Sequence, residues 1–223
     1  MNEKIKPEAA AGGEAPRYIA IEGVIGVGKT TLAALLAERL NGRLVLEQFE
    51  ENPFLPEFYR DPERYAFQTQ IFFLLSRYRQ QQELSQLDLF YEGIVSDYIF
   101  DKDRIFASLT LADHELALYE SVVNALEGNI PAPDLVVYLQ STPERVIQNI
   151  RSRGRAMEME ISPAYLAELA EAYAVYFSHY TAAPVLIVNT GRIDFITDRT
   201  SFEKLVGEIL RPCDAGTRQV HLI

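Results

Sequence analysis

Residues 23–30, Gly-Val-Ile-Gly-Val-Gly-Lys-Thr, are the feature that most constrains how this chain folds. They match the pattern G-x-x-x-x-G-K-[ST], in which backbone N–H groups and a lysine surround phosphate groups. The apolar residues 18–21 before them suit a buried parallel strand, and residues 31–40 after them are strong helix formers. A strand, a glycine loop and a helix N-terminus together create an anion-binding site. The segment therefore predicts a loop that binds polyphosphate.

Each residue type in this loop has an expected role. The backbone surrounds the phosphates, the Lys29 ammonium reaches the outer ones, and the Thr30 hydroxyl is a ligand for Mg²⁺. The alternative is a glycine turn that happens to precede a lysine, but the flanking strand and helix favour phosphate binding. The residues expected at the phosphates are Gly23, Gly26, Gly28, Lys29, Thr30 and Thr31.

Composition limits the other classes of protein. The chain has 223 residues, 48% of them hydrophobic, which suits a packed α/β domain rather than disorder. A net charge of −11 argues against binding to nucleic acid or to an anionic membrane surface. No run of residues is long and apolar enough to span a bilayer. The single cysteine, Cys213, excludes an intramolecular disulfide and indicates a reducing cytoplasm.

Strand-like and helix-like segments alternate, which predicts a parallel sheet flanked by helices. Residues 1–16 lack apolar periodicity and are expected to be a flexible segment before one domain, residues 17–223. Five parallel strands are expected, at 18–21, 43–47, 93–97, 134–139 and 185–188. Helices are expected at 31–40, 62–86, 102–109, 113–126, from 142 onward, at 163–180 and at 201–210.

Two carboxylates follow predicted strands, where ligands of open α/β sheets bind. Asp97 is placed to hold Mg²⁺ directly or through water, although it could instead cap the segment that begins near Tyr98. Glu47 could accept a proton from an acceptor hydroxyl, or could be a solvated carboxylate. Glu50 and Glu51 lie close by in the sequence, so the choice of base stays open.

Gln70 and Arg77 are seven residues apart on the long predicted helix and therefore share a face. An amide and a guanidinium beside Phe73 and Leu74 suit recognition of a flat polar heterocycle. The alternative is a bundle helix with ordinary polar surface positions, and composition leaves the two about even.

An arginine-rich segment follows the fourth predicted strand, with arginines at 145, 151, 153 and 155. Gly154 lies between two of them, which favours a mobile lid that closes over phosphate charge. The alternative is a solvated basic face paired with Glu158 and Glu160.

Taken together, these residues resemble the deoxynucleoside kinase family over residues 18–210. The motifs that carry the resemblance are residues 21–30, 58–65, Gln70 with Ser76-Arg77, 133–139 followed by 142–144, and the segment 153–158. The resemblance implies a P-loop kinase fold with an arginine-rich lid. It also implies an ATP- and Mg²⁺-dependent kinase that phosphorylates the 5′-hydroxyl of a deoxynucleoside, a purine one by similarity to bacterial members, and a homodimer joined through long helices.

The same resemblance implies roles for individual residues. Glu47 would be the catalytic base, assisted by Lys29, while Arg153 and Arg155 would cover the ATP phosphates. The nucleoside would be held by Tyr59 and Glu158 at the sugar 3′-hydroxyl, and by Gln70, Arg77 and Asp103 at the base.

One position departs from the family. Members carry an acid-Arg-Ser triplet after the third strand, whereas this chain has Asp97-Tyr98-Ile99. Arg104 or Lys102 could supply the missing positive charge. Because of this departure, the alternative that the chain is a non-catalytic nucleotide-binding subunit stays open. A thymidylate-type monophosphate kinase is also considered, but it would need extra cations near Glu47, where the chain has acids.

Overall fold

The computed structural model describes residues 15–84, 91–191, 195, 198–211 and 216–220. Within these residues, six parallel strands form one sheet in the order β2-β3-β1-β4-β5-β6. They are β1 (Tyr18–Glu22), β2 (Arg43–Val45), β3 (Ile94–Ser96), β4 (Leu135–Gln140), β5 (Val185–Asn189) and β6 (Thr217–Val220). The predicted α/β class with a parallel sheet is confirmed.

The predicted number of strands was one too low, because β6 was not expected. Its sequence, Thr-Arg-Gln-Val, is mostly polar, and the strand pairs only with β5 at the edge of the sheet. An edge strand has one partner and an open side, so it lacks the apolar run that marks a buried parallel strand.

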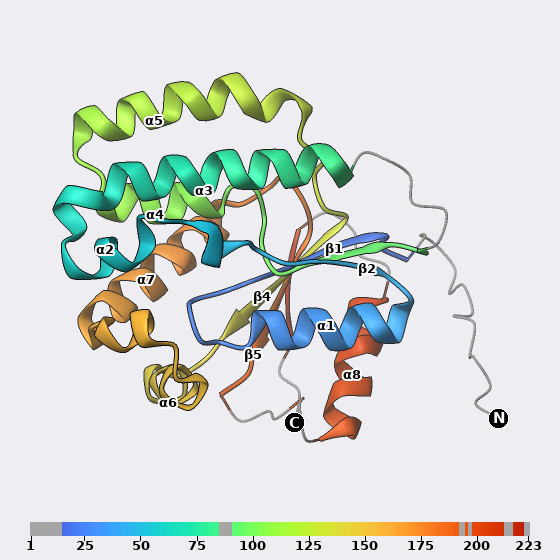
Figure 1. The fold of residues 1–223 in the computed structure, drawn as a ribbon. Coiled ribbons are helices and arrows are strands. Elements are labelled where there is room, and N and C mark those ends of the chain that lie inside the picture. The colour runs from blue at the N-terminus through green and yellow to red at the C-terminus, as the bar shows by residue number, and fades with distance from the viewer. Residues whose placement is uncertain (1–14, 85–90, 192–194, 196–197, 212–215, 221–223) are drawn as a thin grey trace.

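Helices cover both faces of the sheet, with α1 and α8 on one side and α3, α4 and α5 on the other (Figure 1). The helices are α1 (Lys29–Leu40), α2 (Leu55–Arg60), α3 (Pro62–Leu84), α4 (Lys102–Thr110), α5 (Asp113–Leu126), α6 (Pro143–Arg153), α7 (Pro163–His179) and α8 (Arg199–Ile209). Short 3₁₀ turns lie at Phe49–Glu51, Glu127–Asn129 and Ala156–Glu160. No helix in the described part of the chain is long and apolar enough to cross a membrane.

The boundaries follow local chemistry. Side-chain oxygens of Thr142, Ser162 and Asp198 accept backbone N–H groups at the starts of α6, α7 and α8. Strand β2 ends at Val45, so Glu47 lies beyond the strand. The flexible segment expected before residue 17 falls mainly outside the described residues, as does Cys213.

The order of the strands places the site. Strand β1 lies between β3 and β4, and the chain crosses from one side of β1 to the other between these two strands. In open parallel sheets, ligands bind beyond the carboxyl ends of the strands at such a crossing point. The glycine loop leaves β1 there, and Asp97 follows β3.

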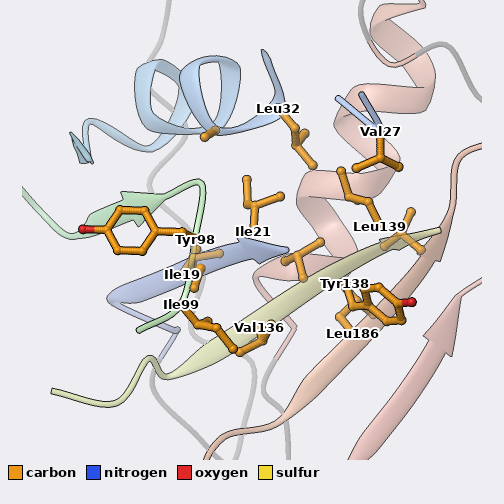
Figure 2. Close-up of a cluster of buried hydrophobic side chains, with 14 of the residues drawn as sticks. Ile19, Ile21, Val27, Leu32, Tyr98, Ile99, Val136, Tyr138, Leu139 and Leu186 are labelled. Atoms are coloured by element: carbon orange, nitrogen blue, oxygen red, sulfur yellow. The ribbon is translucent and has the colours of Figure 1, made fainter. Parts of the chain in front are cut away.

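The core holds the phosphate loop against the sheet. Figure 2 shows Val27 of the loop and Leu32 of α1 among the buried side chains of β1 and β4, including Ile21 and Leu139. Leu32 and Ile21 are fully buried. Because close-packed side chains resist displacement, this packing fixes the loop and the start of α1.

Tyr98 belongs to the same core (Figure 2). The residue is fully buried, and its hydroxyl donates a hydrogen bond to Gln80 Oε1 at 3.0 Å. The position after Asp97 is therefore used for packing.

The loop requires glycine at position 23. Gly23 has a φ of +145°, and a Cβ there would lie 2.5 Å from the carbonyl oxygen of Leu139. Gly23→Ala is expected to lower the free energy of unfolding by about 1–3 kcal/mol, as measured by urea denaturation. Gly128→Ala is the control, because a Cβ at Gly128 meets no atom within 4 Å. Equal stability of the two variants would contradict the prediction.

Candidate active site

A cavity that is partly open to solvent lies at the carboxyl ends of β1, β2 and β3. Predicted site residues that line it are Gly26, Lys29, Thr30, Glu47, Tyr59, Gln70, Arg77, Asp97, Asp103, Arg153, Arg155 and Glu158. Its other lining residues are Ile25, Phe49, Leu55, Phe58, Thr69, Phe73, Lys102 and Phe106. The lining does not include Gly23, Gly28 or Thr31: Gly23 is buried below the loop, and Thr31 is exposed on α1.

The side chain of Lys29 is hydrogen-bonded to the backbone of the glycine loop. Lys29 Nζ donates to the carbonyl oxygens of Gly23, at 2.7 Å, and of Val24, at 3.1 Å. Burial, together with the charge of Lys102, lowers the pKa of Lys29 to about 8, although nearby carboxylates oppose this shift. The loop is also held by Asn149 of α6, whose amide donates to the carbonyl oxygen of Gly26 at 2.9 Å.

The proposed metal ligands lie together. Thr30 Oγ1 donates to Asp97 Oδ2 at 2.6 Å, and the other carboxylate oxygen of Asp97 accepts the backbone N–H of Glu47 at 2.8 Å. A hydroxyl and a carboxylate are oxygen donors of the kind that Mg²⁺ prefers. No group of three or more His, Cys, Asp or Glu in the described residues could hold a metal alone. Mg²⁺ is commonly bound by one or two carboxylates together with substrate phosphates and water.

Of the three acids in this segment, Glu47 faces the cavity, whereas Glu50 and Glu51 are exposed and do not line it. The two oxygens of Glu47 form ion pairs with Arg77 and Lys102. Burial would raise the pKa of this carboxyl, but the charges of Arg77 and Lys102 outweigh burial and hold the pKa below its ordinary value. The carboxylate is therefore ionised, as a proton acceptor must be.

Arg77 connects Glu47 to a second buried acid. Its guanidinium forms an ion pair with Asp103, and each of these two residues is at most 2% exposed. Burial raises the pKa of Asp103 to about 7 despite the opposing charge of Arg77. The Arg77 guanidinium also lies 5.3 Å from the ring centre of Phe73. Arg77 and Asp103 thus form a charged pair set against an aromatic surface.

The shared helical face predicted for α3 is present, since Gln70, Phe73 and Arg77 all line the cavity. Leu74 instead packs in a separate cluster with Phe100 and Tyr119, so the expectation that it lies beside them at the site was wrong. The Gln70 amide has a weak contact of 3.4 Å with Thr110 Oγ1, which leaves it available to a ligand. The ordinary-surface alternative is excluded, because Gln70 is 2% exposed.

Tyr59 of α2 also lines the cavity. Burial and the neighbouring Tyr165 raise the pKa of Tyr59, so its hydroxyl stays protonated and can donate a hydrogen bond.

The arginine-rich segment is divided between the site and the surface. Arg153 and Arg155 line the cavity and both pair with Glu158, which is 6% exposed. The Arg155 guanidinium lies 4.1 Å from the ring centre of Phe49. Arg145 and Arg151 do not line the cavity. The alternative to a lid was a solvated basic face in which the arginines pair with Glu158. The arginines do pair with Glu158, but they do so at the cavity.

Sequence reasoning gave no role to Glu22, a residue at the end of a predicted strand that supports the loop from below. Glu22, at the end of β1, is fully buried and accepts hydrogen bonds from the N–H groups of Gly23 and Ile99 and from the Tyr173 hydroxyl. Burial raises the pKa of this carboxyl. The only signal was an acid at the end of an apolar strand. Glu22 ties the loops after β1 and β3 to α7.

Comparison with known proteins assigns the chain to a family. A family model described as deoxynucleoside kinase matches residues 19–214. The deoxyguanosine kinase of Bacillus subtilis (strain 168) is 33% identical over 197 residues, covering 86% of this chain and 95% of the relative. The deoxyadenosine/deoxycytidine kinase of that organism is 34% identical over 199 residues, covering 86% and 90%.

A solved structure agrees with these relatives. It is deoxyadenosine kinase from M. mycoides with bound dATP, with a TM-score of 0.76 and 26% identity, covering 86% of this chain and 98% of that one. The chain therefore belongs to the deoxynucleoside kinase family and is a phosphotransferase that acts on deoxynucleosides.

Proposed function

We propose that this enzyme transfers the γ-phosphoryl group of ATP to the 5′-hydroxyl of a purine deoxynucleoside, with Mg²⁺, in nucleotide salvage. The observation that carries the proposal is that one cavity contains the phosphate loop, an ionised glutamate and a buried polar face for a base. Relatives named deoxyguanosine kinase and deoxyadenosine/deoxycytidine kinase support a purine substrate.

Glu47 is the proposed base. Its ionised carboxylate accepts the 5′-hydroxyl proton while the hydroxyl oxygen forms a bond to the γ-phosphorus. The bond from that phosphorus to the bridging oxygen breaks, and its electron pair leaves with ADP. Lys29 neutralises charge on the donor phosphates, and Arg153 and Arg155 do so from the lid side.

Mg²⁺ would be held by Asp97 and Thr30, whose oxygen atoms lie 2.6 Å apart. When bound, the ion supplies charge neutralisation at the β- and γ-phosphates. Asp97 also fixes Glu47, because its carboxylate accepts the Glu47 backbone N–H. Asp97 thus links the position of the catalytic base, Glu47, to the metal site.

The nucleoside is proposed to lie between α2, α3 and the lid. Gln70 offers an amide to the base, and Arg77 with Asp103 faces the far edge of the base. Tyr59 and Glu158 are proposed to hold the sugar 3′-hydroxyl, Tyr59 as a donor and Glu158 as an acceptor. Aromatic side chains, among them Phe58 and Phe106, provide the apolar walls.

We also propose that residues 17–223 form one domain, and that two copies associate through α3 and α5. The exposed Leu75 and Leu118 on these helices support an apolar interface. The single cysteine supports a reducing cytoplasm as the location.

Membership of an enzyme family sets aside the non-catalytic alternative. A monophosphate substrate is disfavoured, because the acids Glu50 and Glu51 follow the base in the sequence.

The test is a phosphorylation assay with ATP, Mg²⁺ and each of the four deoxynucleosides, with thymidine monophosphate alongside. The expected result is the highest kcat/KM with deoxyguanosine or deoxyadenosine. Preference for a pyrimidine deoxynucleoside would contradict the purine assignment. Turnover of thymidine monophosphate alone would contradict the proposal that the phosphate acceptor is a nucleoside.

ATP use is expected to depend on the protonation of Lys29. The free-enzyme pKa of about 8 means that the ammonium is lost as pH rises, and with it the attraction for phosphate. We expect kcat/KM for ATP to fall above pH 8 with a slope approaching about tenfold per pH unit, while kcat at saturating ATP changes less. A kcat/KM that stays flat to about pH 9.5 would contradict this. Lys29→Arg is the control, because its charge persists throughout this range.

A further inference from the structure

Lys102 has a position that the fold alone does not favour. It is the first residue of α4, and it lines the cavity with only 5% of its surface exposed. The N-terminus of a helix carries partial positive charge, so a cation there opposes the helix dipole. Burial of an ammonium also costs hydration. Residues that break local preferences in this way concentrate at functional sites.

The ammonium of Lys102 contacts residues that line the cavity. Its ammonium forms an ion pair with Glu47 Oε2 and lies 5.9 Å from the ring centre of Phe106. The other oxygen of Glu47 is bound by Arg77, which also pairs with Asp103. Among the ion pairs of the described residues, Lys102 has no acid besides Glu47. Arg77 is therefore fixed from two sides, whereas Lys102 can leave Glu47 on a flexible stem.

The other cations of the cavity have separate positions. Lys29 is held by the glycine loop, and Arg153 and Arg155 are held by Glu158 at the lid. The residue that follows Asp97 is the neutral, buried Tyr98. Among the cavity's cations in the described residues, Lys102 is thus the one whose ion pair is with the proposed base alone.

We propose that Lys102 is a catalytic residue whose ammonium passes from Glu47 to the transferring phosphoryl group. The inference rests on the proposed function, in which Glu47 takes the 5′-hydroxyl proton. When it does so, Glu47 becomes neutral and its attraction for Lys102 falls. Negative charge then lies on the phosphoryl oxygens and the departing ADP oxygen, and the ammonium follows that charge.

The bonds made and broken are those of the kinase reaction, with ATP as co-reactant. The oxygen of the 5′-hydroxyl bonds to the γ-phosphorus, the bridging P–O bond breaks, and its electrons remain on ADP. The proton stays on Glu47 until products leave and water accepts it. Lys102 keeps its own three protons throughout and acts by charge alone.

The test is Lys102→Met, which removes the charge and nearly keeps the volume. We expect kcat to fall by about 100-fold or more, while the Kd for nucleoside measured calorimetrically without ATP changes by less than about threefold. Lys102→Arg, which restores a cation, is expected to recover part of kcat. Arg104→Met is the matched control, because Arg104 lies two residues along α4 and pairs with Asp101, Glu120 and Glu127 outside the cavity.

A kcat for Lys102→Met within about threefold of wild type would overturn the proposal, as would a loss found only in nucleoside Kd. Failure of Lys102→Arg to exceed Lys102→Met would overturn it too. If thermal melting shows that Lys102→Met does not fold, Lys102→Gln is used with the same criteria. All assays use the deoxynucleoside that wild type turns over fastest, so an error in the purine assignment leaves this test intact.

Discussion

Glu47→Gln is expected to lower kcat by about 10³-fold, because an amide cannot accept the 5′-hydroxyl proton. Glu47 is the acid of its segment that lines the cavity, and its carboxylate is held ionised by two cations. Glutamine keeps the shape and one carbonyl oxygen, so one of the two cations, Arg77 or Lys102, retains a hydrogen-bond acceptor. Nucleoside affinity, measured by calorimetry without ATP, is expected to stay within about fivefold of wild type.

Glu50→Gln is the matched control for this variant. Glu50 lies three residues from Glu47 but is exposed and does not line the cavity. Its kcat should equal that of wild type. Near-normal turnover by Glu47→Gln would remove Glu47 as the base, and a large loss in Glu50→Gln would point to that neighbouring acid instead.

Arg77→Met is expected to lower the free energy of unfolding by about 3–5 kcal/mol, because it leaves the buried Asp103 without its cation and Glu47 with Lys102 alone. Asp103 is 1% exposed, so water cannot replace the guanidinium there without a change in packing. The free energy of unfolding would be measured by urea denaturation at pH 8, above the pKa of about 7 that Asp103 has beside Arg77.

Two further variants separate charge from packing. Arg79→Met removes an exposed arginine from the same helix and is expected to change stability by less than about 0.5 kcal/mol. Arg77→Met combined with Asp103→Asn removes the unpaired acid together with the cation. The double variant should be more stable than Arg77→Met alone. Equal stability of Arg77→Met and Arg79→Met would show that the buried pair contributes nothing to folding.

The glycine loop and the strand ends could be predicted from sequence because their physics is local. A loop with glycines at 23, 26 and 28 adopts positive φ angles, and all three are observed. Parallel strands bring their carboxyl ends to one edge, so Glu47 and Asp97 were expected near the loop. The structure places the Glu47 backbone N–H 2.8 Å from Asp97.

The sequence did not reveal β6 or Glu22, because neither has a local pattern. The edge strand has little apolar surface, and a buried acid is recognised only from the groups that donate to it. The pairing of Glu158 with Arg153 and Arg155 was considered as a surface feature, and only the packing of the segment against the cavity showed where it occurs.

The sequence by itself determined the phosphate loop, the parallel α/β sheet and the residue types of a nucleoside kinase, since these depend on backbone geometry and periodicity within short segments. Tertiary structure alone decided which of two cations on α4 meets Glu47. From the sequence, Lys102 and Arg104 were equal candidates for this position, but side chains two residues apart on a helix point in different directions. Lys102 therefore enters the cavity, and Arg104 pairs with acids outside it.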